Sequence, residues 1–172
     1  MKILGSIVFA LLLFAGPVQA AEIKIGYLDI RQAIATSDAG KAASSQLQTK
    51  FLKVQEQAAA KQKELNSLKD ELEKQGMALN ETSKAAKMKE YQQKQRDFER
   101  FVKDSEEELK KTEMELINKI QTDIIKQVRE YGKKSGFMLI VEAQEAGAIY
   151  ADKSIDVTDA VLKELNAQFN KK

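Results

Sequence analysis

The sequence predicts an α+β protein that is predominantly α, with a small oligomeric β-containing body and a long projecting antiparallel helical coiled-coil hairpin. The first observation behind this fold class is glycine spacing. Residues 41–75 and 77–131 contain neither glycine nor proline and are rich in Lys, Glu, Gln, Ala and Leu, which favour helix. The second is a seven-residue repeat of apolar side chains in both stretches. The third is that strand-like apolar segments occur only near the two ends of the chain.

Residues 1–20 have the features of a secretory signal peptide. Lys2 is followed by a nearly unbroken apolar run over residues 3–15, and Pro17 and small residues precede the expected cleavage site after Ala20. An uncleaved membrane anchor is the alternative, but the run is shorter than the ~20 apolar residues that span a bilayer. We therefore expect export and cleavage. The chain has no cysteine, so its folding needs no disulfides, which fits a bacterial envelope better than a small secreted animal scaffold.

The outgoing helix of the expected hairpin has apolar residues at alternating steps of four and three, with Lys61 and Gln75 at two positions of the repeat. These residues are Leu47, Phe51, Val54, Ala58, Leu65, Leu68, Leu72 and Leu79. The returning helix continues the step at Met88, Tyr91, Phe98, Val102, Leu109 and Leu116, with Gln95, Ser105 and Thr112 in the seam. We expect these helices to form an arm over residues 41–131.

The tip of this arm is expected near residues 76–83. Gly76 is a suitable end for the outgoing helix, and Asn80, Thr82 and Ser83 are candidate caps for the returning one. An outgoing helix of about 36 residues is ~54 Å long at 1.5 Å per residue. Because a compact domain of this size is much narrower, the hairpin must project.

Residues 21–40 and 132–172 are expected to form the body. Its expected elements are strands at 23–28, 137–141 and 148–151, a short helix begun by Asp29 and Gln32, and a last helix begun by Asp156 and Asp159. The strand at 137–141 is continuously apolar, which is typical of burial on both faces, and residues 148–151 should return from a turn as its hairpin partner. Strands from both ends of the chain must then meet, with the arm inserted between them.

The body is too small to be stable alone. Its expected ordered segments, 22–36 and 137–170, comprise 49 residues, and a core of that size without a disulfide or metal usually needs another stabiliser. We therefore predict that its strands pair or pack between subunits. The predicted oligomer core consists of Ile23, Ile25, Tyr27, Phe137, Leu139, Val141 and Ile149.

The composition argues against an enzyme. The chain lacks both His and Cys, which removes serine triads, imidazole bases and thiolate sites. The segment from Gly132 to Ser135 weakly resembles a phosphate loop, but Gln127 occupies the position of the required first glycine and a helix precedes it. Three glutamates at 106–108 point ~100° apart on a helix and cannot converge on one ion. We predict no catalytic, cofactor-binding or metal-binding residue.

A basic stripe on the returning helix is the strongest binding signal in the residues themselves. Between residues 74 and 103 there are eight basic and four acidic residues, and four of the basic ones share an arc opposite the seam. These four are Lys89, Arg96, Arg100 and Lys103. The stripe is either the solvated face of a coiled coil or a site for anionic lipid, lipopolysaccharide or acidic polypeptides. It has no interleaved aromatic residues, which disfavours nucleic acid.

Three segments at the chain ends resemble the Skp family of periplasmic chaperones, also called OmpH. They are Ile-Lys-Ile-Gly-Tyr-Leu-Asp at 23–29, Phe-Met-Leu-Ile-Val-Glu-Ala at 137–143 with Ala-Ile-Tyr-Ala at 148–151, and Asp-Val-Thr-Asp-Ala-Val-Leu at 156–162. The arms are similar in length and composition. The resemblance implies a homotrimer whose β-body carries three helical arms around a cavity, holding unfolded outer-membrane proteins without ATP. It also implies that basic arm residues bind lipopolysaccharide in some relatives.

Two other functions stay open at this point. A structural periplasmic adaptor whose hairpin tip docks a partner would share the arm, although adaptors of this kind flank the hairpin with further β-domains, and here only 49 residues flank it. A lipopolysaccharide- or membrane-surface-binding protein would use the basic stripe. A holding chaperone would use the arm walls, where many weak contacts shield a client before it reaches lipid.

Overall fold

The computed structural model describes residues 23–75 and 80–171. In chain order the elements are β1 (Ile25–Leu28), α1 (Ile30–Thr36), α2 (Asp38–Gln75), α3 (Glu81–Lys134), β2 (Leu139–Glu142), a 3-10 turn (Lys153–Ile155) and α4 (Thr158–Phe169). The protein is predominantly helical with one small strand pair, as predicted. The expected signal peptide and the expected helix end at Gly76 lie outside the described residues.

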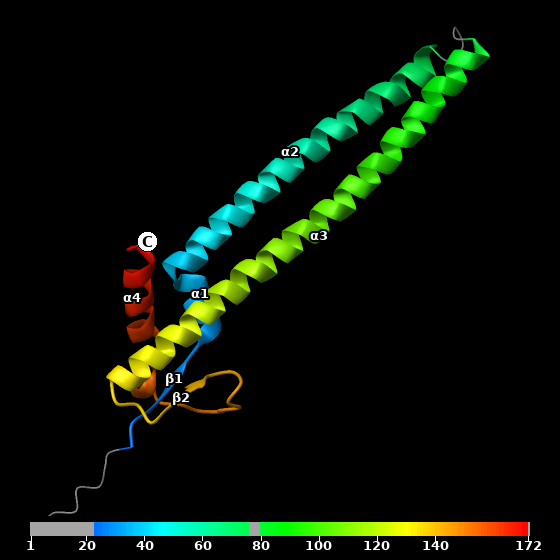
Figure 1. Cartoon of the computed structure of the whole chain (residues 1–172). Coiled ribbons are helices and arrows are strands. Elements are labelled where there is room, and N and C mark those ends of the chain that lie inside the picture. The colour runs from blue at the N-terminus through cyan, green and yellow to red at the C-terminus, as the bar shows by residue number, and fades with distance from the viewer. Residues whose placement is uncertain (1–22, 76–79, 172) are drawn as a thin grey trace, which may run out of the picture.

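Helices α2 and α3 run antiparallel and side by side as a long arm, and the smaller elements gather at its root (Figure 1). The 38 residues of α2 and the 54 residues of α3 correspond to ~57 and ~81 Å at 1.5 Å per residue. The extra length of α3 continues through the body. Asn80 caps α3 by accepting a hydrogen bond from the Ser83 amide, which confirms one of the candidate caps.

The two strands form a parallel pair in which Ile25 lies opposite Leu139 and Tyr27 lies opposite Val141. On its other edge, β1 is bridged to Asp156. Side chains alternate along each strand. Gly26 and Leu28 therefore face the helices, and the pairs Ile25–Leu139 and Tyr27–Val141 face outward. The strands from the two ends of the chain therefore meet, as expected.

The predicted strand at 148–151 was wrong. The described chain is irregular there, and β2 pairs with β1 instead. After β2 the Glu142 carboxylate accepts hydrogen bonds from the amides of Gln144 and Glu145, and Gly147 has a φ of 63°. This turn carries the chain away from an antiparallel path beside β2. Leu139 is also 56% exposed, so β2 is not covered on both faces within one chain.

The core lies where α1, α4 and β1 surround the root portion of α3. Its buried side chains are Leu28, Ala33, Ile120, Ile124, Val157, Val161, Leu162 and Leu165. Asp29 caps α1 by accepting from the Gln32 amide, but the amide of Asp29 donates to the hydroxyl of buried Thr158. The expected reciprocal contact from Gln32 is therefore replaced by one that ties the start of α1 to α4.

Candidate interaction surfaces

The arm is attached to the body at a sharp break between α1 and α2. Ser37 is fully buried and separates the helices, and its hydroxyl donates to the carbonyl of Ile34 and accepts from the amide of Gly40. A Cβ on Gly40 would lie 1.8 Å from the Ile34 carbonyl oxygen. Only glycine therefore allows this close crossing of the two helices.

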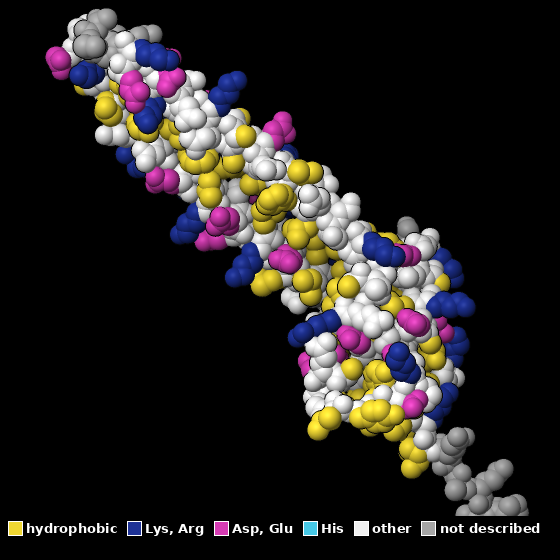
Figure 2. Space-filling model, turned by 180° about the vertical axis from the view of Figure 1, so that it is seen from behind, with side chains coloured by type: hydrophobic (Ala, Val, Ile, Leu, Met, Phe, Trp, Pro, Cys, Tyr) yellow, Lys and Arg dark blue, Asp and Glu magenta, His cyan; other side chains and the backbone are white. Residues whose placement is uncertain are grey.

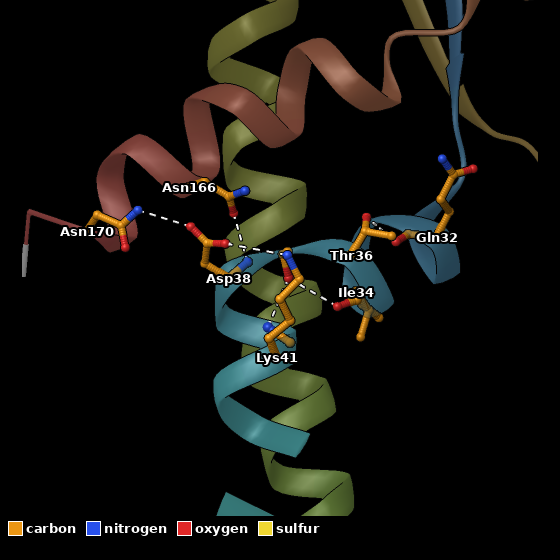
Figure 3. Close-up of polar contacts among 9 residues, drawn as sticks. Gln32, Ile34, Thr36, Asp38, Lys41, Asn166 and Asn170 are labelled. Atoms are coloured by element: carbon orange, nitrogen blue, oxygen red, sulfur yellow. Dashed lines mark hydrogen bonds and ion pairs between the residues drawn. The ribbon is translucent and has the colours of Figure 1, made fainter. Parts of the chain in front are cut away.

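Helix α4 supports the same junction from the other side (Figure 3). The side-chain oxygen of Asn166 accepts a hydrogen bond from the Asp38 amide at 3.0 Å, and Asn170 donates to the Asp38 carboxylate at 3.0 Å. The first turn of α2 has unpaired amides that need such acceptors. A side chain 128 residues away in sequence thus helps to cap the first arm helix.

The seam between α2 and α3 buries few side chains and is partly polar. Leu65 is its buried apolar residue on α2, whereas Ser105 and Thr112 are buried on α3. Lys50 reaches into the seam and donates to the Thr112 hydroxyl. Phe51, which the repeat placed in the seam, is instead 50% exposed. The predicted period is present at Leu47, Val54 and Leu68, which are half-buried, but at the level of Phe51 the half-buried residue is Lys50.

Ion pairs between the helices lie along one flank of the arm. Lys50 pairs with Glu108 at 3.2 Å, Glu64 with Lys94 at 2.8 Å, and Glu71 with Lys87. On each helix these positions are multiples of seven residues apart, so they share one side of the seam. We call this side the paired flank. Its remaining seven-residue level holds Gln57 and Phe101, where the Lys61 ammonium lies 5.1 Å from the Phe101 ring centre.

In the pair of Glu64 and Lys94 each partner shifts the pKa of the other. The hydrogen bond and charge of Lys94 lower the pKa of the Glu64 carboxyl, and the same contact raises the pKa of Lys94. Glu90 lies four residues before Lys94 on the same helix, yet Lys94 forms its ion pair with Glu64 on the other helix. The inter-helix partner lies close enough for a 2.8 Å contact.

The basic stripe is exposed on α3. Lys89, Arg96, Arg100 and Lys103 are all exposed, and none makes an ion pair within the part of the chain that the structure describes. Arg96 donates to Gln93 on its own helix. The four side chains thus share one helix and a solvated setting. Their role in anion binding stays a prediction.

The outer face of the strand pair forms an apolar hollow at the end of the body away from the arm (Figure 2). Five of the predicted oligomer-core residues line it together, and they are Ile25, Tyr27, Leu139, Val141 and Ile149. Ile149 is fully exposed. Ile23, two residues before Ile25 in the sequence, is 68% exposed. Burial raises the pKa of Tyr27, and the Asp156 carboxylate adds to the effect, so this hydroxyl stays protonated.

Phe137, the seventh predicted oligomer-core residue, lies on the core side of the body. Its ring centre is 5.8 Å from that of Tyr131, and the Lys24 ammonium lies 4.3 Å from its ring centre. Gly26 brings the β1 backbone close to the same ring, because a Cβ there would lie 3.0 Å from it. Phe137 therefore supports the strand pair from within the chain.

Comparison with known proteins now assigns the chain. The family model described as outer membrane protein (OmpH-like) matches residues 24–165. The chain belongs to the OmpH-like family. A crystal structure of an OmpH-like protein from Caulobacter crescentus CB15, proposed to be an outer membrane chaperone, superimposes with a TM-score of 0.80 at 19% identity and covers 91% of this chain and 92% of that one. At this identity the likeness shows the fold. No curated protein matches the chain.

Other kinds of site are not evident in this OmpH-like structure. Within residues 23–75 and 80–171 no group of three acidic residues is placed to hold a metal ion. No helix in those same segments is long and apolar enough to cross a membrane. The surfaces that stand out are thus the apolar hollow, the basic stripe and the arm itself.

Sequence reasoning missed the difference between the two sides of the arm. The signal was present, because Lys50, Glu64 and Glu71 on one helix and Lys87, Lys94 and Glu108 on the other recur at multiples of seven residues. As the residue number rises on α2, that of its ionic partner on α3 falls by the same amount, as an antiparallel register requires. Opposite charges four residues apart on one helix, such as Glu90 and Lys94, compete with this pattern in the sequence.

Proposed function

We propose that this OmpH-like chain is an ATP-independent periplasmic holding chaperone that binds unfolded outer-membrane β-barrel proteins between helical arms. The observation that carries the proposal is the contrast between a root with many buried side chains and a long arm with few, on which apolar side chains such as Phe51 are exposed. The family assignment supports it. Residues 1–20 act in this proposal as the cleaved export signal that delivers the chain to the periplasm.

The cavity of this proposal needs several copies of the chain. We propose that the apolar hollow on the outer face of β1 and β2 is covered by neighbouring subunits in a homotrimer, which sets three arms around one space. Exposed apolar clusters of this kind are typical of subunit interfaces. A client held among the arms is kept from pairing its strand edges with another client. Weak, multiple contacts then permit release to a final fold without nucleotide.

The test is light-scattering chromatography of the mature protein after a urea-unfolded outer-membrane β-barrel is diluted into it without nucleotide. We expect a soluble peak with the mass of three copies plus one client. A client that pellets while the protein elutes alone as an oligomer would overturn the chaperone proposal and favour a structural adaptor. A soluble complex of another stoichiometry would retain holding and reject the trimer.

The basic stripe supports a second candidate function, binding of anionic lipid or lipopolysaccharide. Its cations are exposed and have no ion-pair partner in the described segments, so they are available to phosphate groups. The test changes Lys89, Arg96, Arg100 and Lys103 to Gln and measures binding to lipopolysaccharide and to an unfolded barrel separately. Loss of lipopolysaccharide binding alone supports this second role, and unchanged binding to both rejects it.

A further inference from the structure

We propose that one uncharged face of α2, which we call the neutral face, is the surface on which the arm holds an extended segment of an unfolded polypeptide. It consists of Ser44, Gln48, Phe51, Leu52, Gln55, Ala58, Ala59, Gln62 and Asn66. The inference rests on the proposed holding function and assigns it to named residues. It concerns a different helix from the basic stripe.

The lack of charge on this face is unusual for this chain, in which 31% of all residues are charged. At 100° per residue the nine side chains occupy an arc of about 120° along six turns. The same arc carries Lys41 before the face and Lys69 after it. All nine are exposed except half-buried Ala58. A helix face that only had to stay soluble would carry Lys and Glu, as the other faces of the arm do.

The side chains present suit contact with a polypeptide backbone. Gln48, Gln55 and Gln62 each have an amide that both donates and accepts hydrogen bonds, which matches the free N–H and C=O groups of an unfolded chain. Phe51 and Leu52 are 50% and 53% exposed and provide apolar contact. Covering such a face requires no charged group to leave water, a step that would be costly.

The length of the face matches one strand of a membrane barrel. From Ser44 to Asn66 the helix rises ~33 Å, and an extended chain covers that distance with about ten residues. A transmembrane β-strand has ~9–11 residues. At its root end the face meets an apolar groove between the helices, to which Ser44, Leu47 and Ile117 contribute. An extended segment therefore has a continuous path from the arm to the body.

Two other features favour this occupant over an anionic ligand. The neutral face has no cation of its own between Lys41 and Lys69, and Lys63 lies about 20° outside its arc, so phosphate gains little there. It also lies away from the paired flank, where Lys50 and Glu64 are engaged across the seam. The arm thus closes one flank with ion pairs and leaves neutral amide and apolar groups exposed on another.

The test places a charge of either sign at neighbouring positions. Ala59 lies within the arc of the neutral face, about 20° from one edge, and Ala60 is also exposed but points ~100° farther round the helix, outside the arc. The variants are Ala59→Glu, Ala59→Lys, Ala60→Glu and Ala60→Lys, with Leu52→Gln to remove apolar contact without charge. Binding is measured as the fluorescence change of a labelled, urea-unfolded outer-membrane barrel titrated with each mature protein. Circular dichroism and light scattering check the fold and mass of every variant.

We expect both Ala59 variants to weaken client binding by about fivefold or more, because either charge must be desolvated. Leu52→Gln should weaken it about threefold through lost apolar contact, while both Ala60 variants stay within twofold of wild type. Equal effects at 59 and 60, or opposite effects of Glu and Lys at 59, would overturn the assignment of this face. A change of oligomer mass at 59 alone would assign it to contacts between copies. Failure of the wild-type protein to hold the client would reject the underlying function instead.

Discussion

The body and the arm of this protein are packed in different ways. In the body, Ile124 and Val161 are completely buried, and side chains from α1, α3, α4 and β1 surround them. In the described arm, Leu65 is the buried apolar side chain, and polar Ser105 and Thr112 occupy other seam positions. The arm therefore depends more on hydrogen bonds within its own helices, with a small contribution from the paired flank. The root thus holds the arm in place, while apolar side chains on the arm such as Phe51 stay exposed and available for contact with another polypeptide.

The largest expected effect tests the root itself. Gly40→Ala places a Cβ 1.8 Å from the Ile34 carbonyl oxygen, so the α1–α2 crossing must open. We expect a loss of about 5 kcal/mol in unfolding free energy, because a 1.8 Å contact with backbone forces the two helices apart and this overpacking far exceeds the ~1 kcal/mol that alanine gains in helix propensity. Urea unfolding followed by circular dichroism measures it. The exposed neighbour Ala42, changed to Ser, is the control, and equal stability of both variants would contradict the close crossing.

A second pair of variants compares the two packings directly. Ile124→Ala removes a fully buried side chain from the body, and Leu65→Ala removes the buried one from the arm. We expect losses of about 4 and about 2 kcal/mol respectively, because the looser arm can collapse around the missing atoms. Hydrogen exchange should show Leu65→Ala loosening the arm while the body stays protected. Equal losses, or an equal spread of exchange through both regions, would remove the distinction between root and arm.

The regular parts of the fold followed from the sequence, and the failures have a common cause. Helix propensity and the seven-residue repeat gave the two arm helices, and Asn80 was a recognisable cap. The repeat did not distinguish Phe51 from Lys50 at the seam, because helix rotation depends on both partners. Contacts such as Asn166 on Asp38 join residues 128 positions apart, and no local pattern indicates them.

The candidate surfaces were predicted unevenly for the same reason. Apolar alternation brought Ile25 and Tyr27 of β1 and Leu139 and Val141 of β2 to one hollow, because every second side chain of a strand lies on the same face. Ile149 reaches the hollow from an irregular segment, which alternation does not explain. Phe137 lies just before β2, where its ring turns toward Tyr131, and alternation does not apply there. The strand expected at 148–151 failed because apolar content does not show whether a partner edge is within reach.

The smallest expected effect concerns the paired flank and depends on pH. Lys94 lowers the pKa of Glu64 from its usual 4.5, so the stabilisation from this carboxylate is present above pH 4.5 and is lost as pH falls through the lowered value. Glu64 raises the pKa of Lys94 above 10.5, so that part is lost only at strongly alkaline pH. The pair should therefore contribute throughout the neutral range and disappear in acid.

Glu64→Gln tests this against the wild type by thermal unfolding at pH 7 and at pH 2. We expect a lower melting temperature for the variant at pH 7, by less than Leu65→Ala causes because exposed ion pairs contribute little, and convergence of the two proteins at pH 2. Glu56→Gln, which removes a carboxylate with no ion pair in the described part of α2, should match wild type at pH 7. High salt should reduce the Glu64 effect. A difference that persists in acid and in salt would mean that Glu64 acts through packing, and the flanks of the arm would then differ in shape and not in charge.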